Sequence, residues 1–98
     1  MRYALQVILS FRHSGLARFY RSGSKAGIQP KHADKLALQL FALNRAKSSK
    51  DMIAPGWDLH PLQGTMQGHW SIKVNGNWRL LFTFEGENVV LVDYCDYH

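Results

Sequence analysis

The last three residues of the chain, Asp96, Tyr97 and His98, combine a carboxyl, a phenol and an imidazole. Each of these groups can take or give a proton, and imidazole titrates close to neutral pH. Acid–base cleavage of RNA needs such groups, because one must remove the 2′-hydroxyl proton and another must protonate the leaving 5′-oxygen. The three residues are therefore candidates for this chemistry, and the alternative is a frayed chain end without a role.

His60 and Arg79 are the candidates outside the tail. His60 lies within the segment 57–64, where we expect it at the exit of a strand; the alternative is a hydrogen-bonded histidine in a turn. Arg79 can supply the positive charge that stabilises a phosphorane. Its side chain should point away from that of Trp78, and the alternative is a surface arginine paired with Glu85 or Asp93.

The remaining histidines and the single cysteine have simpler interpretations. His13 and His32 stand beside polar residues, so we expect them to be solvated on helix surfaces, and we expect His69 to be structural. Cys95 is expected to fill space. A metal site is an alternative for the imidazole and acidic groups, but no element supplies a close pair of ligands, so we predict neither a metal nor another cofactor. Its ligands would be His60, His69, Asp96 and His98.

Two helices are expected in the first half of the chain. Apolar residues at helical spacing predict a helix over 11–20, with Ser10 or Ser14 as its cap. The same spacing predicts a second helix over 31–44, opened by Pro30. A short strand over 3–9 precedes them, and the polar segment 46–55 is expected to form a surface connection.

The second half changes to a twofold period, which is typical of strands. Alternating apolar residues predict strands over 70–74, 78–84 and 89–92, joined by turns at Asn75-Gly76 and over 85–88. The third strand should hold the chain end against the sheet. We therefore predict one α+β domain over 1–98, in which two N-terminal helices pack on a small antiparallel sheet.

Charge is unevenly distributed along the 98 residues. Twelve Lys and Arg against seven Asp and Glu give a formal charge of +5, and ten of the basic residues precede residue 51, where Asp34 is the one acid. The excess of positive charge favours a polyanionic partner that binds the helical half of the chain. One cysteine, no signal-peptide pattern and no long apolar run predict a cytoplasmic protein without a membrane partner.

Five segments resemble HigB-type toxins of bacterial toxin–antitoxin systems, within the RelE/ParE superfamily. They are 10–16, 59–64, 68–72, 74–79 and 96–98. The resemblance runs from about Val7 to His98. It implies a small antiparallel sheet with two helices, and a metal-independent endoribonuclease that cuts translated mRNA on the ribosome. It also implies a HigA-like helix-turn-helix antitoxin as partner.

The resemblance assigns the acid and base roles to His60 and His98, in an order that the sequence leaves open. Asp96 and Tyr97 would position or assist them, and Arg79 would stabilise the phosphate. Relatives often carry lysine where this chain has Gln63, so Gln63 and Lys73 are secondary candidates for RNA contact.

Two further departures concern the chain ends. Met1–Gln6 extends beyond the family's usual start, and Asp93-Tyr94 precedes Asp96-Tyr97 as a second acid–phenol pair. We choose the latter pair as the one facing RNA, because His98 follows it. The competing functions are a non-catalytic ParE-like inhibitor of DNA gyrase and a passive RNA-binding module. Paired imidazoles favour the nuclease, because neither competitor needs them.

Overall fold

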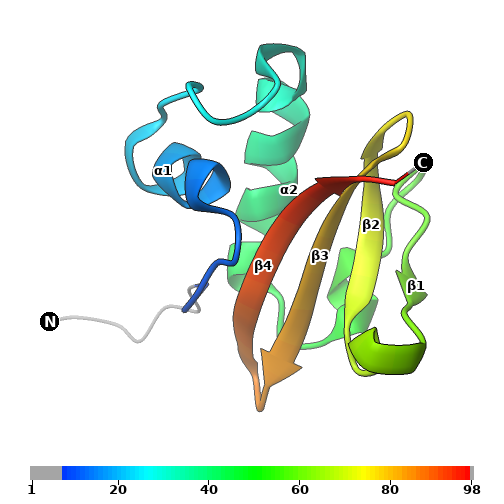
Figure 1. Cartoon of the computed structure of the whole chain (residues 1–98). Helices are drawn as coiled ribbons and strands as arrows, with labels where there is room; N and C mark the ends of the chain where they lie inside the picture. The colour runs from blue at the N-terminus through cyan, green and yellow to red at the C-terminus, as the bar shows by residue number, and fades with distance from the viewer. Residues whose placement is uncertain (1–7, 98) are drawn as a thin grey trace, which may run out of the picture.

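A four-stranded antiparallel sheet in the order β1-β2-β3-β4 forms the centre of the computed structural model, which describes residues 8–97 (Figure 1). Two helices precede the sheet in the chain, so the predicted α+β arrangement is confirmed. None of the helices in this described part is long and apolar enough to cross a membrane. The elements are α1 (Ser14–Ser22), η1 (Pro30–His32), α2 (Ala33–Arg45), η2 (Ser49–Met52), β1 (His60–Pro61), η3 (Gly64–Met66), β2 (Trp70–Asn75), β3 (Trp78–Glu85) and β4 (Asn88–Asp96), where η denotes a 3₁₀ helix.

The first helix begins three residues later than predicted, because a histidine caps it. His13 Nδ1 accepts a hydrogen bond from the Leu16 N–H at 2.9 Å, so the predicted serine cap is wrong. Ser10 instead accepts the Leu91 N–H at 2.9 Å. The helix ends at Gly23, whose φ of 81° suits a left-handed cap and whose N–H bonds the Phe19 carbonyl.

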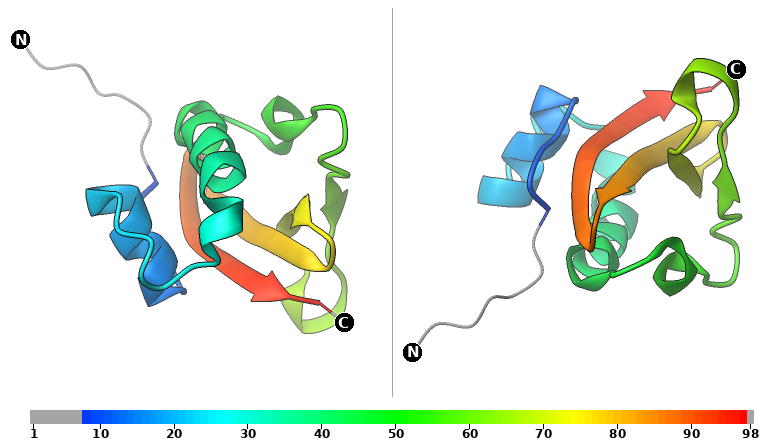
Figure 2. Two further views of the ribbon diagram at one scale, coloured as in Figure 1. Left: turned by 90° about the horizontal axis from the view of Figure 1, so that it is seen from above. Right: turned by 90° about the horizontal axis from the view of Figure 1, so that it is seen from below.

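The second predicted helix is confirmed, with Pro30 at its opening as a 3₁₀ turn. The apolar stripe of α2 packs on one face of the sheet (Figure 2). On that face Ile72 pairs with Leu80, and Leu80 pairs with Tyr94, so their side chains lie together. They belong to the same core cluster as Leu36 and Leu40 of α2.

The connection after α2 is more structured than predicted. It contains η2, capped reciprocally by Ser48 and Asp51, and it buries Ala46 and Met52 almost completely. The prediction of a surface connection is therefore wrong at these two apolar residues. The burial anchors the segment that leads from α2 to β1.

Both predicted hairpin turns are confirmed. Asn75 pairs with Trp78 across the first turn, and Glu85 pairs with Asn88 across the second. The last strand is longer than predicted, because β4 continues to Asp96. The chain end is thus carried along the sheet as far as the start of β3.

The segment before α1 lies against the outer edge of β4, with α1 beside it (Figure 2). Ile8 bridges Val89 and Phe11 bridges Val92, both in parallel orientation. These contacts cover part of an edge that would otherwise expose unpaired backbone groups. The strand predicted over 3–9 lies almost wholly outside the described residues.

Candidate active site

The face of the sheet opposite α2 brings together three of the candidates, His60, Lys73 and Arg79. His60 pairs with Ser71, Lys73 pairs with Arg79, and Arg79 pairs with Cys95. Paired residues share a face, and so do alternate residues of one strand. These five residues therefore define one surface, which we call the open face.

Arg79 is held in place by three hydrogen bonds. Its Nη2 lies 3.1 Å from Asp58 Oδ2, and its Nη1 lies 3.4 Å from both the Asp58 carbonyl oxygen and Ser71 Oγ. The Arg79 side chain is only 17% exposed, while that of Asp58 is 60% exposed. The partner is thus Asp58, and neither Glu85 nor Asp93.

His60 also contacts Asp58. Its Nδ1 lies 3.0 Å from the Asp58 carbonyl oxygen and 4.0 Å from Asp58 Oδ2, and its side chain is 46% exposed. The strand predicted before His60 is wrong, because β1 begins at His60 itself. Asp58 precedes it with a φ of 51°, in the left-handed region. The structure therefore joins His60 and Arg79 through Asp58.

The chain end runs beside the start of β3. Asp96 pairs with Trp78, one step along the ladder from the pair formed by Arg79 and Cys95, and the Tyr97 N–H donates to the Asn77 carbonyl at 2.8 Å. By register Asp96 falls on the side of Trp78, not on the open face. Tyr97 is 44% exposed. His98 lies outside the described residues.

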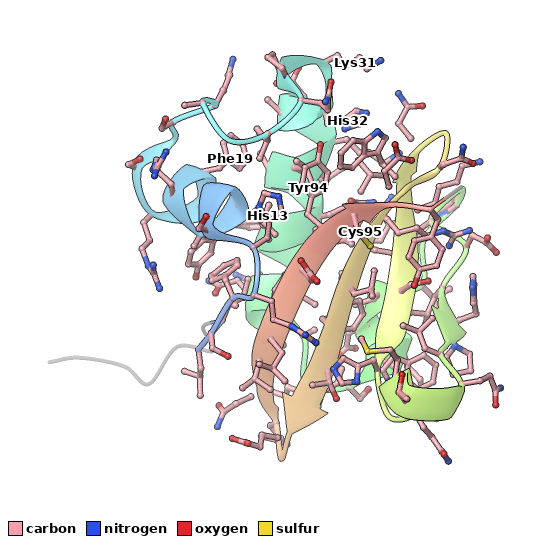
Figure 3. The ribbon with its side chains drawn as sticks, viewed as in Figure 1. His13, Phe19, Lys31, His32, Tyr94 and Cys95 are labelled. Carbon is pink, nitrogen blue, oxygen red and sulfur yellow. The ribbon has the colours of Figure 1, made fainter. Side chains whose placement is uncertain are left out.

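The other acid–phenol pair has a different place. Tyr94 is buried, stacks on Trp78 with ring centroids 4.6 Å apart, and lies with its hydroxyl 2.7 Å from His32 Nδ1 (Figure 3). Burial raises the pKa of Tyr94 above its usual value. Tyr94 is a core residue, and the exposed tyrosine belongs to the pair that contains Asp96.

The same contacts correct two histidine predictions. His32 is 1% exposed and is not solvated, while His13 is half-buried as a helix cap, with its ring against that of Tyr94, and is solvated only in part. Burial, assisted by Lys31, lowers the pKa of His32. Both rings are part of the packing between the helices and β4 (Figure 3).

Cys95 lies on the open face beside Arg79, but its thiol is poorly suited to nucleophilic attack. Burial, with the Asp93 and Asp96 carboxylates, raises its pKa to about 11. A thiol with this pKa is protonated at neutral pH, and the thiolate is the reactive form. Of the secondary candidates, Lys73 is exposed on the open face and Gln63 is exposed at the start of η3.

A family profile described as the RelE-like toxin of the type II toxin–antitoxin system HigB matches residues 9–98. The chain belongs to the HigB-like toxin family. It is 34% identical over 92 residues to Endoribonuclease HigB of Proteus vulgaris, covering 94% of this chain and all of that one. It is 32% identical over 94 residues to Toxin HigB-1 of Vibrio cholerae serotype O1, covering 94% and 98%. The predicted family resemblance is confirmed.

Solved structures of related toxins share the fold. The YoeB dimer from Staphylococcus aureus superposes with a TM-score of 0.61 at 17% identity, covering 95% of this chain and 98% of that chain. A YoeB/ParE toxin from Agrobacterium tumefaciens gives 0.60 at 16% identity, covering 94% and 98%. The predicted RelE/ParE-like fold is thereby confirmed for this HigB-like toxin.

Asp58 is the residue of this HigB-like site that the sequence did not single out. It stands 21 positions before Arg79, so nothing in the sequence indicates that the two side chains meet. The available signal is its place inside the segment that carries His60. Only the fold of the loop before β1 shows that its carboxylate meets Arg79.

Proposed function

We propose that this HigB-like toxin is an endoribonuclease that cuts translated mRNA on the ribosome by metal-independent acid–base chemistry. The observation that carries the proposal is the junction of His60 and Arg79 through Asp58 at one exposed place on the sheet. An imidazole and a guanidinium held together supply a proton-transfer group and a phosphate-binding cation. The name of the Proteus vulgaris relative, Endoribonuclease HigB, supports the same activity.

The reaction divides between these groups as follows. One base removes the proton of the RNA 2′-hydroxyl, whose oxygen then attacks the adjacent phosphorus. The bond from phosphorus to the 5′-oxygen breaks, and an acid gives that oxygen its proton. His60 and His98 take these two roles, with Asp96 and Tyr97 positioning or assisting them. Arg79 stabilises the negative charge of the phosphorane.

The surroundings of the site suit a polyanionic substrate. Lys73 lies beside Arg79 on the open face, and the chain carries a formal charge of +5. Phosphate contacts of this kind give affinity that falls steeply with salt. Lys73 and Gln63 contact the RNA, although Gln63 brings no charge to a position where relatives often carry lysine.

Membership of this family also implies an antitoxin partner. The partner proposed here is a HigA-like helix-turn-helix protein, and the complex is proposed to act in the cytoplasm. Co-expression tests this part, because growth arrest by the toxin should be relieved by such a protein. Failure of every helix-turn-helix protein encoded beside the toxin to relieve the arrest would contradict it.

The decisive experiment maps RNA ends in a translating extract, with and without ribosomes. We expect cuts confined to translated message, and their loss in His60→Ala and His98→Ala but not in the exposed control Gln67→Ala. Cleavage of free RNA overturns ribosome dependence. Inhibition of DNA supercoiling without RNA cleavage overturns the nuclease and supports the gyrase alternative.

Metal independence needs its own control, because ribosomes require magnesium. A chelator selective for transition metals is added at constant free magnesium, so the ribosomes stay intact. Unchanged cleavage is expected. Loss of cleavage, with restoration by added zinc or manganese, would show that the site uses a metal.

A further inference from the structure

We propose that Asp58 is the positioning residue of this site, holding Arg79 through its carboxylate and its main-chain carbonyl, and holding His60 through the same carbonyl. The proposal rests on the proposed function, in which His60 and Arg79 act on the same phosphodiester. It adds a residue that neither the family motifs nor the predicted acid–base pair includes. Three observations carry it.

The first observation is the hold on Arg79. The Asp58 carboxylate and carbonyl together meet both terminal nitrogens of the guanidinium, at 3.1 and 3.4 Å, and Ser71 Oγ adds a third contact at 3.4 Å. Arginine has five N–H donors in a rigid plane, so donors remain for a phosphate once these contacts fix the plane. Asp58 thus sets the direction in which Arg79 can meet RNA.

The second observation is the hold on His60. A carbonyl oxygen can only accept a hydrogen bond, so the contact at 3.0 Å requires the proton on His60 Nδ1. In the neutral ring Nε2 is then the unprotonated nitrogen. The Asp58 carbonyl therefore selects the tautomer in which His60 can accept the 2′-hydroxyl proton, and it selects the nitrogen that does so.

The third observation is the backbone of Asp58. Its φ of 51° is left-handed, a conformation that aspartate, asparagine and glycine tolerate better than other residues. Such conformations concentrate at functional sites, where the surrounding structure enforces them. Here the neighbouring Trp57 is buried, and its carbonyl accepts the Lys73 N–H at 2.7 Å, which ties the loop to β2.

These facts define a series of variants that separates the carboxylate contact with Arg79 from the backbone conformation that places the Asp58 carbonyl. Asp58→Asn keeps the left-handed preference and an oxygen that can accept from Arg79. Asp58→Gly keeps the backbone preference alone, and Asp58→Ala keeps neither. Glu87→Gln, at an exposed turn, is the control that removes one carboxylate elsewhere.

The kinetic expectation follows from that series. Asp58→Asn should keep kcat within about threefold of the wild type, with an equal or lower KM, because no carboxylate then competes with the RNA phosphate. Asp58→Gly should lose about tenfold in kcat, and Asp58→Ala should approach the loss of about 100-fold that misplacement of a reacting group causes. Values of kcat and KM equal to those of the wild type in all three variants would overturn the positioning role.

A second readout does not depend on catalysis. Nitrogen-15 NMR of the His60 ring should show the Nδ1–H tautomer in the wild type, Asp58→Asn and Asp58→Gly, and a mixture of tautomers in Asp58→Ala. The same tautomer in all four proteins overturns the proposal. Urea denaturation of the four proteins separates this order from a general loss of stability, because the tautomers are compared only under conditions in which every variant is folded.

The two proposals can fail separately. If translated message is cut by the wild type and equally by Asp58→Ala, the positioning role is wrong and the proposed function stands. If the wild type cuts no message, the proposed function is wrong. In that case the NMR series alone decides whether Asp58 positions His60.

Discussion

The two faces of the sheet are made from alternate residues of the same strands. In β3, Leu80 is buried beneath α2, while its neighbour Arg79 reaches Asp58 on the open face. In β4, Tyr94 is buried against Trp78 and His32, while its neighbour Cys95 pairs with Arg79. A step of one residue therefore separates a packing role from a place in the candidate site.

Two histidines show what the faces do to the same side chain. His32 is 1% exposed, bonds the Tyr94 hydroxyl, and has a lowered pKa because of burial. The His60 side chain is 46% exposed and bonds a main-chain carbonyl. The first ring serves the packing, and the second is free to meet a substrate. The same type of side chain therefore takes a different role according to its burial and its partners.

The largest effect is expected on the open face. His60→Ala should lower ribosome-dependent cleavage by about 10²- to 10⁴-fold, because it removes one partner of the proton transfer. The free energy of unfolding should change by less than about 0.5 kcal/mol, since the side chain is exposed. End mapping of the message and urea denaturation measure the two quantities. A stable variant with full cleavage would break the division between the faces.

The opposite pattern is expected beneath α2. Phe82 is fully buried in the core cluster, and Phe82→Ala should cost about 3–5 kcal/mol of unfolding free energy. Cleavage per folded molecule, measured at low temperature and corrected for the folded fraction from circular dichroism, should stay near that of the wild type. A large loss of specific activity would mean that the open face depends closely on packing behind it.

The periods of the sequence predicted the two helices, turn residues predicted the hairpin turns, and the resemblance of five segments indicated the family, because all of these depend on local pattern. The alternation of the sequence did not predict which residues of β4 face α2. Leu91 has a φ of 57°, and the pairing with β3 shifts between Leu81 and Thr83, so an irregularity resets which residues face α2. The burial of Tyr94 follows from this irregularity.

The candidate site was predictable only in part. The residue types of His60 and Arg79 indicate their chemistry, but their link through Asp58 depends on a left-handed residue and a contact across 21 positions. The burial of His32 likewise depends on β4, 62 positions away. Long-range contacts of this kind leave no periodic signal in the sequence.

A matched pair of tyrosine variants tests the comparison between buried and exposed residues, with smaller expected effects. Tyr94→Phe keeps the ring stacked on Trp78 but leaves His32 Nδ1 and the Gln29 N–H without the hydroxyl they contact, at 2.7 and 3.3 Å. We expect a loss of about 1–3 kcal/mol in unfolding free energy and no loss of cleavage per folded molecule. Tyr97→Phe, at the exposed tyrosine, should lower cleavage per folded molecule and leave the unfolding free energy unchanged. Equal behaviour of the two variants in both assays would contradict the choice between the acid–phenol pairs.

The smallest effect concerns pH. Burial lowers the pKa of His32 in the folded protein below its ordinary value of 6.5, so between those two pKa values the unfolded chain binds more protons. Unfolding free energy should therefore fall as the pH drops below about 6.5, by at most about 1.4 kcal/mol per pH unit from this one group. Urea denaturation between pH 7.5 and about 5.5 measures the slope, and His32→Asn should reduce it. An unchanged slope in that variant would show that groups other than His32 cause the pH dependence of the unfolding free energy.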